Sequence, residues 1–337
     1  MLRRASHRSY SVTISALNRF IFVGRIVMEK NKVADVIGEV ELAPQSTPAE
    51  KSGFYTKLKK ECKNFFTYNL PGKAPRVWEL DLIRGIIMIF VSIDHIARFS
   101  HYWGIVQFQT AFGKALENFA VSYFESDISD NVYPLALWFL CFMSGISSQF
   151  TRSRLSRLLK FWGFCALFMG VYLALHFIFP EQITGYIVFN IVAVLTLSVT
   201  VWFVFDKLNV PDFVRLIFGV IFIITGITFF LVYRLGGRTF FIENDFLAVL
   251  LYNEHGYKIS PNNFEPLIPH LGFFILGGVC GKYYYKDKTS RLRRKTPPKW
   301  LTPLMILGKH SLVAYLFLPT VGILLLLLTV KFVGLFL

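Results

Sequence analysis

Ionisable residues stand inside an apolar segment at 80–100 that is long enough to cross a bilayer. They are Asp81, Arg84, Asp94, His95 and Arg98. A charge inside hydrocarbon is costly, so ionisable residues in such a segment indicate a functional site. A guanidinium binds anionic groups in fixed geometry, and an imidazole exchanges protons near neutral pH. The residue types therefore indicate anion binding combined with proton chemistry.

A helix over this segment would bring three of these residues onto one face. At ~100° per residue, Asp81, Arg84 and His95 share a face, while Asp94 and Arg98 form an i,i+4 pair on an adjoining one. Arg84 and His95 are eleven residues apart, which is ~16 Å along a helix axis. This arrangement suits a protein that holds an anionic cytosolic molecule and moves a proton deeper in the membrane. Two alternatives stay open: charged anchoring of the helix start, and a neutral histidine bonded to a backbone carbonyl.

The composition predicts an all-α, polytopic transmembrane helix bundle. The chain has 337 residues, of which 54% are apolar and 17% charged. The apolar residues gather in blocks of a length that spans ~30 Å of hydrocarbon. We place about seven blocks, at 80–100, 132–150, 158–179, 185–205, 213–233, 266–285 and 311–335. The stretches at 104–124 and 239–252 are also apolar, so eight or nine membrane helices remain open.

The charges between the blocks predict the orientation of the bundle. A net charge of +15 in a soluble protein would suggest a nucleic-acid partner. Here basic and non-basic connections alternate, which is typical of topology signals and of contacts with anionic lipids. We therefore expect membrane lipids as partners, no nucleic acid, a cytoplasmic N-terminus and an outer C-terminus.

The polar N-terminal region differs from the rest of the chain. We predict a basic, largely disordered cytoplasmic region at 1–74 and a membrane domain at 75–337. Residues 1–27 are rich in arginine and lack acids, which is typical of a mitochondrial transit segment; the alternative is translation from Met28. The four cysteines form no Cys-x-x-Cys pair, so we expect neither a disulfide framework nor a metal site. The membrane, bacterial inner or organellar, stays open.

The first apolar block carries a recognisable motif. Asp81-Leu-Ile-Arg84-Gly85, with His95 eleven residues after the arginine, resembles the first-helix signature of the heparan-α-glucosaminide N-acetyltransferase catalytic domain family. Later blocks of that family resemble stretches at 142–148, 187–192, 264–277 and 307–315. The resemblance covers roughly residues 75–325. Among the departures, Ala193 falls near a family histidine, His270 replaces a tryptophan, and Leu316 follows Tyr315 where a histidine is common.

The resemblance implies transfer of an acyl group, usually acetyl, from cytosolic acyl-CoA to an amine or hydroxyl of a saccharide or glycolipid. A thioester donor needs no metal, and a histidine of near-neutral pKa suits removal of the acceptor's proton. The implied catalytic residues are His95, Asp81 and Arg84. Those implied to bind the CoA donor are Arg84, Arg152, Arg154 and Lys309. Secondary site residues are Asp94, His270 and Ser311.

Other functions stay open at this point. The departures from the motif allow a catalytically degenerate family member with a structural role. Charges along the first helix also allow a transporter-like protein, although the inverted repeats common in transporters are not evident. The acceptor, the acyl chain and any homo-oligomer cannot be read from the sequence.

Overall fold

A computed structural model describes residues 56, 60–61, 63–68, 76–102, 111–126, 128–151, 153–178, 189–236, 241–260, 264–292 and 297–336. The chain divides into two units, Met1–Glu61 and Cys62–Leu337, and the second unit contains everything discussed below. The predicted transit segment and Arg152 lie outside the described residues.

Every regular element of the described residues is a helix, so the all-α class is confirmed there. The long helices are α3 (Trp78–Tyr102), α4 (Ala111–Phe124), α5 (Tyr133–Ser147), α6 (Arg154–Ile178), α7 (Ile191–Lys207), α8 (Asp212–Leu235), α11 (Leu267–Tyr284) and α13 (Ser311–Phe336). Shorter ones are α9 (Asp245–Ala248), α10 (Glu254–Ile259), α12 (Thr302–Lys309), the π-helical turn η2 (Ile128–Val132) and the 3-10 turns η3 (Ser148–Phe150) and η4 (Lys299–Leu301).

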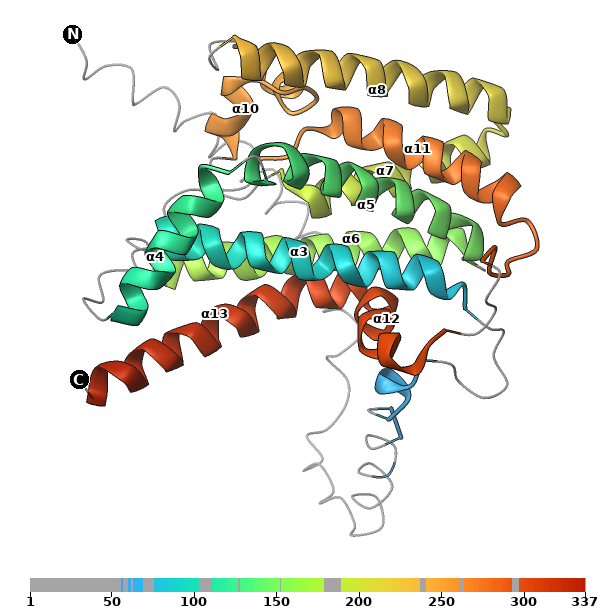
Figure 1. Ribbon diagram of the computed structural model, residues 1–337. Coiled ribbons are helices and arrows are strands. Elements are labelled where there is room, and N and C mark those ends of the chain that lie inside the picture. The colour runs from blue at the N-terminus through green and yellow to red at the C-terminus, as the bar shows by residue number, and fades with distance from the viewer. Residues whose placement is uncertain are drawn as a thin grey trace, which may run out of the picture. The chain divides into compact units, whose positions relative to one another are not determined.

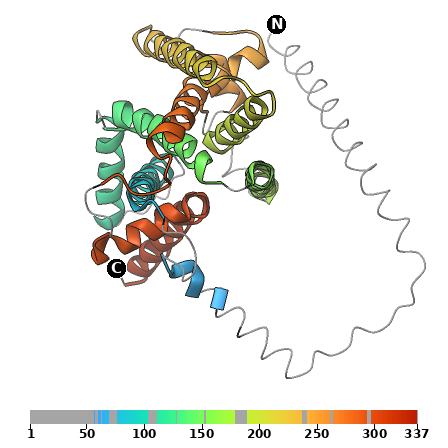
Figure 2. The ribbon, with the colours of Figure 1, turned by 90° about the vertical axis from the view of Figure 1, so that its right-hand side faces the viewer.

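The long helices lie side by side. Figure 1 shows α8, α11, α5 and α3 in succession, with α12 and α13 beyond α3, and these neighbours are in contact. Figure 2 shows several of them nearly end-on. Figure 1 also shows that α3, α6 and α8 begin, and α11 ends, at the same end of the bundle. We call this the basic end, because Arg84, Arg154 and Lys282 lie there.

Among the described residues, fewer helices meet the length and composition of a membrane span than the sequence predicts. In the described part of the chain two stretches are long and apolar enough to span, Arg154–Ala174 and Asp212–Leu235. A third is the pair Lys299–Lys309 and Ser311–Gly322, if its 97° bend lies within one span. The prediction of about seven spans is thus not confirmed. The reason is that α3 carries several charges, and α5 and α7 have only 15 and 17 residues, fewer than the ~20 that a span needs.

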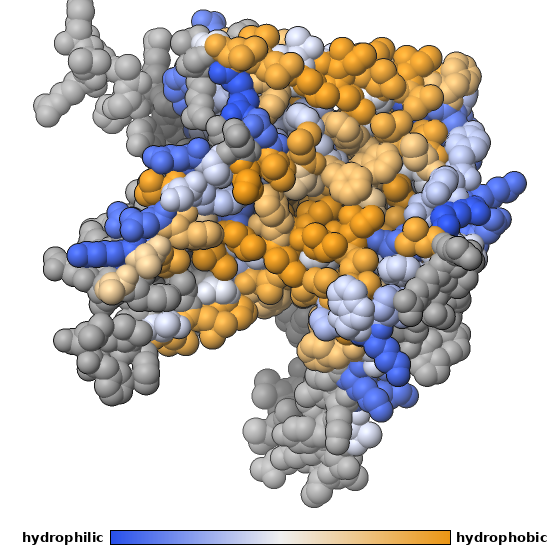
Figure 3. All heavy atoms as spheres, in the orientation of Figure 1, coloured by the Kyte–Doolittle hydropathy of each residue, from blue (hydrophilic) through white to orange (hydrophobic). Residues whose placement is uncertain are grey.

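Apolar side chains cover the outside of α8. Phe213, Ile217 and Ile224 are 66%, 52% and 60% exposed, and Figure 3 shows a hydrophobic surface over this helix. A large exposed apolar surface marks contact with lipid or with another protein. On a helix of this length and composition, lipid contact follows most directly.

Glycines allow α3 and α12 to cross at very short range. A Cβ atom at Gly308 would lie 1.6 Å from the backbone oxygen of Asp81, and one at Gly85 would lie 1.9 Å from that of Leu304. Only glycine permits such a backbone approach, which is common between membrane helices. The crossing places the start of α3 directly against the end of α12.

Asn190 begins α7 with a side-chain cap. Its Oδ1 accepts hydrogen bonds from the backbone N–H groups of Val192 and Ala193, at 3.0 and 3.1 Å, in a fully buried position. We expect Asn190→Ala to lower the free energy of unfolding by about 1–2 kcal/mol, because it removes this cap. Asn190→Ser should retain most of the stability, since serine caps helices well. Thermal unfolding in detergent measures both, and equal losses in the two variants would contradict the capping role.

Candidate functional site

Asp81 organises the polar contacts at the basic end of α3. Its carboxylate is 1% exposed and accepts hydrogen bonds from Tyr68 Oη (2.9 Å), Arg76 Nε (2.6 Å) and Nη2 (3.0 Å), and Arg84 Nη2 (2.6 Å). Burial and the Asp81 charge raise the pKa of Tyr68, so its phenol stays protonated and donates. Asp81 thus holds one hydroxyl and two guanidinium groups in fixed positions.

Arg84 fastens α12 to α3. Its Nη1 donates to the backbone oxygen of Gly308 at 3.2 Å, and its Nε donates to that of Leu80 at 3.2 Å. A guanidinium that bonds to two carbonyls and to Asp81 has most of its donors engaged within the protein. The structure therefore gives Arg84 a positioning role, in addition to its positive charge.

Lys309 lies at the bend between α12 and α13 and donates hydrogen bonds to the segment 63–68, which precedes α3. Its Nζ donates to the backbone oxygens of Asn64, Phe65 and Thr67 at 3.2, 3.4 and 2.8 Å. Ser311 begins α13 two residues later and is partly buried. Lys309 and Ser311 thus follow Gly308, the residue that Arg84 contacts, within three positions. The described hydrogen bonds of Lys309 hold backbone oxygens of 64–67.

Arg157 is a residue of this end that sequence reasoning did not single out. Its Nη2 donates to Ser144 at the backbone oxygen (2.9 Å) and at Oγ (3.3 Å), and its guanidinium lies over the Phe161 ring, 5.6 Å from the centroid. These partners are all neutral, and the nearby charge of Arg84 repels that of Arg157. Since Arg76 and Arg84 already share Asp81, this part of the protein carries excess positive charge, which favours an anionic ligand.

His95 lies at the opposite end of α3. Its Nδ1 is 2.8 Å from the backbone oxygen of Val91. A carbonyl only accepts, so Nδ1 carries the hydrogen, and in the neutral ring Nε2 carries the lone pair. The ring lies edge-to-face with Tyr315, at 5.7 Å between centroids, and the side chain is 24% exposed. A hydrogen bond to a backbone carbonyl is also expected for a histidine with a purely structural role, but this bond leaves Nε2 as the basic nitrogen.

Asp94 forms hydrogen bonds with Arg98 and Tyr123 rather than with His95. Its buried carboxylate accepts from Arg98 Nε at 2.8 Å and from Tyr123 Oη, on α4, at 2.9 Å. His95 Nδ1 is 4.0 Å away, beyond hydrogen-bond distance. Asp94 and Arg98 therefore form the expected i,i+4 pair, and Asp94 is not the partner of His95 in a catalytic dyad.

Glu265 and His270 form a second buried pair. His270 is fully buried, its Nδ1 is 2.7 Å from the backbone oxygen of Pro266, and its Nε2 is 3.5 Å from Glu265 Oε2. Within the described residues, Nε2 has no hydrogen-bond partner. The Glu265 carboxyl interacts electrostatically with Arg98 and Asp94 of α3. Glu265 was not predicted, because the sequence alone does not show that a residue before α11 faces α3.

The buried position of Glu265 predicts a pH dependence of stability. Burial raises the pKa of its carboxyl from 4.5 to about 8, against the opposing effect of Arg98. The folded state then binds this proton more tightly than the unfolded state. Stability should therefore fall as the pH rises from about 4.5 to about 8. We expect Glu265→Gln to remove this part of the pH dependence of the melting temperature. Parallel curves for the two proteins would contradict the assignment.

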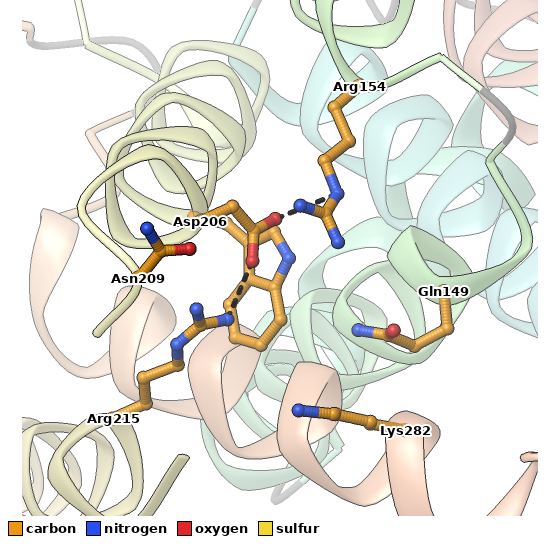
Figure 4. Close-up of a pocket in the computed structure, with 7 residues that line it drawn as sticks. Gln149, Arg154, Asp206, Asn209, Arg215 and Lys282 are labelled. Carbon is orange, nitrogen blue, oxygen red and sulfur yellow. Dashed lines mark hydrogen bonds and ion pairs between the residues drawn. The ribbon is translucent and has the colours of Figure 1, made fainter. Parts of the chain in front are cut away.

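A polar cavity opens at the basic end between α6, α7, α8 and α11. It has a volume of about 210 Å³ and is lined by Gln149, Arg154, Trp202, Asp206, Asn209, Arg215 and Lys282 (Figure 4). Of the predicted donor-binding residues that the structure describes, Arg154 lines it. Arg154 Nε lies 3.0 Å from Asp206 Oδ2, and Arg215 Nη1 lies 2.8 Å from Asp206 Oδ1. The cavity could not be predicted from the sequence, because the stretch 206–215 has balanced charge and reveals no binding site.

The predicted site residues thus separate into groups along the bundle. Asp81, Arg84, Lys309 and Ser311 lie around the α3–α12 crossing, and Arg154 lines the cavity. Asp94, His95 and His270 lie toward the other end, with Arg98, Tyr123 and Glu265. Within the described parts of the chain, no three His, Cys, Asp or Glu side chains are grouped as for a metal ion.

Comparison with known proteins agrees with the motif. The sequence profile of the family described as "heparan-alpha-glucosaminide N-acetyltransferase, catalytic" matches residues 76–319. This range contains α3 through the first turns of α13, and with them every site residue described above except Tyr68. No curated protein and no solved structure matches the chain.

Proposed function

Because the chain belongs to the heparan-α-glucosaminide N-acetyltransferase catalytic family, we propose that it is a multi-pass membrane enzyme that transfers an acetyl group from acetyl-CoA to an amine or hydroxyl of a saccharide. The observation that carries this proposal is the arrangement of α3. One end of this helix adjoins an excess of guanidinium groups, and the other presents a histidine whose Nε2 is basic.

His95 is proposed as the general base. The acceptor N–H or O–H gives its proton to Nε2 while the acceptor atom attacks the thioester carbonyl. The carbon–sulfur bond then breaks, and the CoA sulfur leaves and takes up a proton. The bond from Nδ1 to Val91 fixes the tautomer and the ring orientation that this role requires. Tyr315 packs against the ring and limits its rotation.

The donor phosphates are proposed to bind at the basic end. Arg157 supports this, because its described partners are neutral and it adjoins Arg84. Arg84 and Asp81 support it indirectly, since they hold α12 against α3. Arginine binds phosphate in bidentate geometry, which suits the several charges of CoA. The pantetheine arm would then extend along α3 toward His95, a distance of ~16 Å from Arg84.

A catalytically degenerate protein is the second candidate. It is favoured by Ala193, a buried residue of α7 near the place of a family histidine. In that case the bundle would keep its fold and bind a partner or ligand without turnover.

Transfer by the purified protein separates the two candidates. The full-length protein in detergent is incubated with labelled acetyl-CoA and a panel of amino sugars, neutral sugars and glycolipids. The proposal predicts a labelled amide or ester on at least one saccharide. If the protein is folded and binds acetyl-CoA but labels none of them, the degenerate alternative is correct.

A further inference from the structure

The cavity at the basic end contains three cationic side chains and one carboxylate. The cations are Arg154, Arg215 and Lys282, and the carboxylate is Asp206. Arg215 is buried and donates to Asp206 Oδ1 and to the backbone oxygens of Phe205 and Val210. Asp206 is thus bound between two guanidinium groups, so the cavity keeps a positive balance.

Some of the cationic donors are available to a ligand. Arg154 meets Asp206 through Nε, and its side chain is 59% exposed. Lys282 pairs with Asp212 outside the cavity lining and is 53% exposed. In Figure 4 the side chains of Gln149, Arg154 and Lys282 point toward the same space. Two exposed cations and an amide that face one space can bind the oxygens of a phosphate.

One aromatic ring lines this polar cavity, and an apolar surface lies nearby. The Trp202 ring lies under the Arg215 guanidinium, 4.8 Å from its carbon, and packs against the position of Gly278. Arg215 belongs to the first turn of α8, and the same turn carries the exposed Phe213. The cavity therefore adjoins the start of α8, which is long and apolar enough to span a membrane. If α8 spans, the cavity would lie near the depth of the headgroup phosphates.

We propose that this cavity binds a phosphate ester, as a site separate from the general base at His95. The phosphate would lie between the Arg154 guanidinium and the Lys282 ammonium, with Gln149 as a neutral donor and Asp206 holding the arginines in place. The same chemistry is offered by two sources: the headgroup of an anionic phospholipid and the phosphates of a soluble nucleotide such as CoA. If CoA is the ligand, the inference rests on the proposed function; if a lipid is the ligand, it does not.

Binding to two kinds of probe tests this inference. The full-length protein is placed in nanodiscs of phosphatidylcholine, with or without phosphatidylglycerol, and retained lipids are counted by native mass spectrometry. In phosphatidylcholine nanodiscs, CoA is titrated by calorimetry. The double variant Arg154→Gln/Lys282→Gln should lose at least tenfold in affinity for one of the two probes. Rising salt should weaken binding of that probe to the unaltered protein, because both cations are exposed.

A matched control lies at the same end of the bundle. Lys207 closes α7, lies over the Phe203 ring and does not line the cavity, so Lys207→Gln removes one positive charge at the same depth. It should bind both probes as the unaltered protein does. The charge-keeping double variant Arg154→Lys/Lys282→Arg should retain most of the binding, which separates lost charge from lost packing.

The outcomes decide between the sources. If the double variant loses binding of phosphatidylglycerol alone, the cavity is assigned to a lipid headgroup. If it loses binding of CoA alone, the cavity is assigned to a soluble organophosphate. If the double variant, the Lys207→Gln control and the unaltered protein bind both probes equally, the inference is wrong. Failure of the proposed acetyl transfer would be seen separately, as absence of labelled saccharide from a protein whose cavity still binds phosphate.

Discussion

Replacement of Asp81 with alanine is expected to lower the free energy of unfolding by about 3–5 kcal/mol, because a buried ion pair loses one partner. The Asp81 carboxylate is 1% exposed and accepts four hydrogen bonds from three side chains. Without it, Arg84 would keep a charge in a mostly buried position with only backbone oxygens as partners. Arg76 is 38% exposed and would regain water, so Arg84 accounts for most of the loss.

A surface carboxylate provides the comparison. Asp287 is 66% exposed and meets Arg291 at 3.1 Å in an i,i+4 pair. Asp287→Ala should change stability by no more than ~0.5 kcal/mol, as usual for exposed pairs. Asp81→Asn keeps the shape of the side chain but not its charge. Its loss in free energy of unfolding should lie between those of Asp81→Ala and Asp287→Ala. Denaturant or thermal unfolding in detergent measures all three. Equal stability of Asp81→Ala and Asp287→Ala would show that Asp81 does not organise the α3–α12 crossing.

Replacement of His95 with alanine is expected to reduce kcat for acetyl transfer by about 10²–10⁴-fold, the usual contribution of a general base. The KM for acetyl-CoA should change little, since the donor phosphates are proposed to bind at the other end of α3, ~16 Å away. A catalytic role of His95 predicts a lower kcat per folded molecule with an unchanged KM. A structural role would instead lower the amount of folded protein. Initial rates at several donor concentrations, normalised to folded protein, give both constants.

His255 is the matched control for this substitution. It belongs to α10, and its Nε2 is 2.6 Å from Asp245 Oδ1, a carboxylate that is 85% exposed. His255→Ala removes an imidazole from α10 and leaves the residues of α3 unchanged. Its kcat should equal that of the unaltered protein. An unchanged kcat in His95→Ala would exclude His95 as the base, and an equal loss in both variants would point to a general loss of structure.

The positions of residues along α3 could be predicted from the sequence, because helical geometry follows from spacing alone. The Asp81–Arg84 and Asp94–Arg98 contacts lie three and four residues apart, and the period of a helix predicts such pairs. Contacts between distant segments could not be predicted in the same way. The bond from Arg84 to Gly308 joins residues 224 positions apart. It depends on a backbone approach that the glycines permit but do not specify.

Two residues show the limit of sequence reasoning about this site. Arg157 lies in a basic run at 152–160, and composition does not reveal which of its members faces the interior of the bundle. Glu265 precedes α11 by two residues. Its carboxyl interacts with Arg98 and Asp94 only because α11 and α3 both pack near α5. In both cases the missing information is the packing of one helix on another.

Acetyl transfer across a sealed vesicle tests the central claim most directly. The protein is reconstituted in vesicles of known orientation, with a membrane-impermeant amino sugar enclosed inside and labelled acetyl-CoA added outside. If the donor binds at the basic end and His95 serves an acceptor at the other end, label should reach the enclosed sugar only when the basic end faces outward. Labelling that occurs only when donor and sugar are on the same side of the membrane would contradict this account of α3.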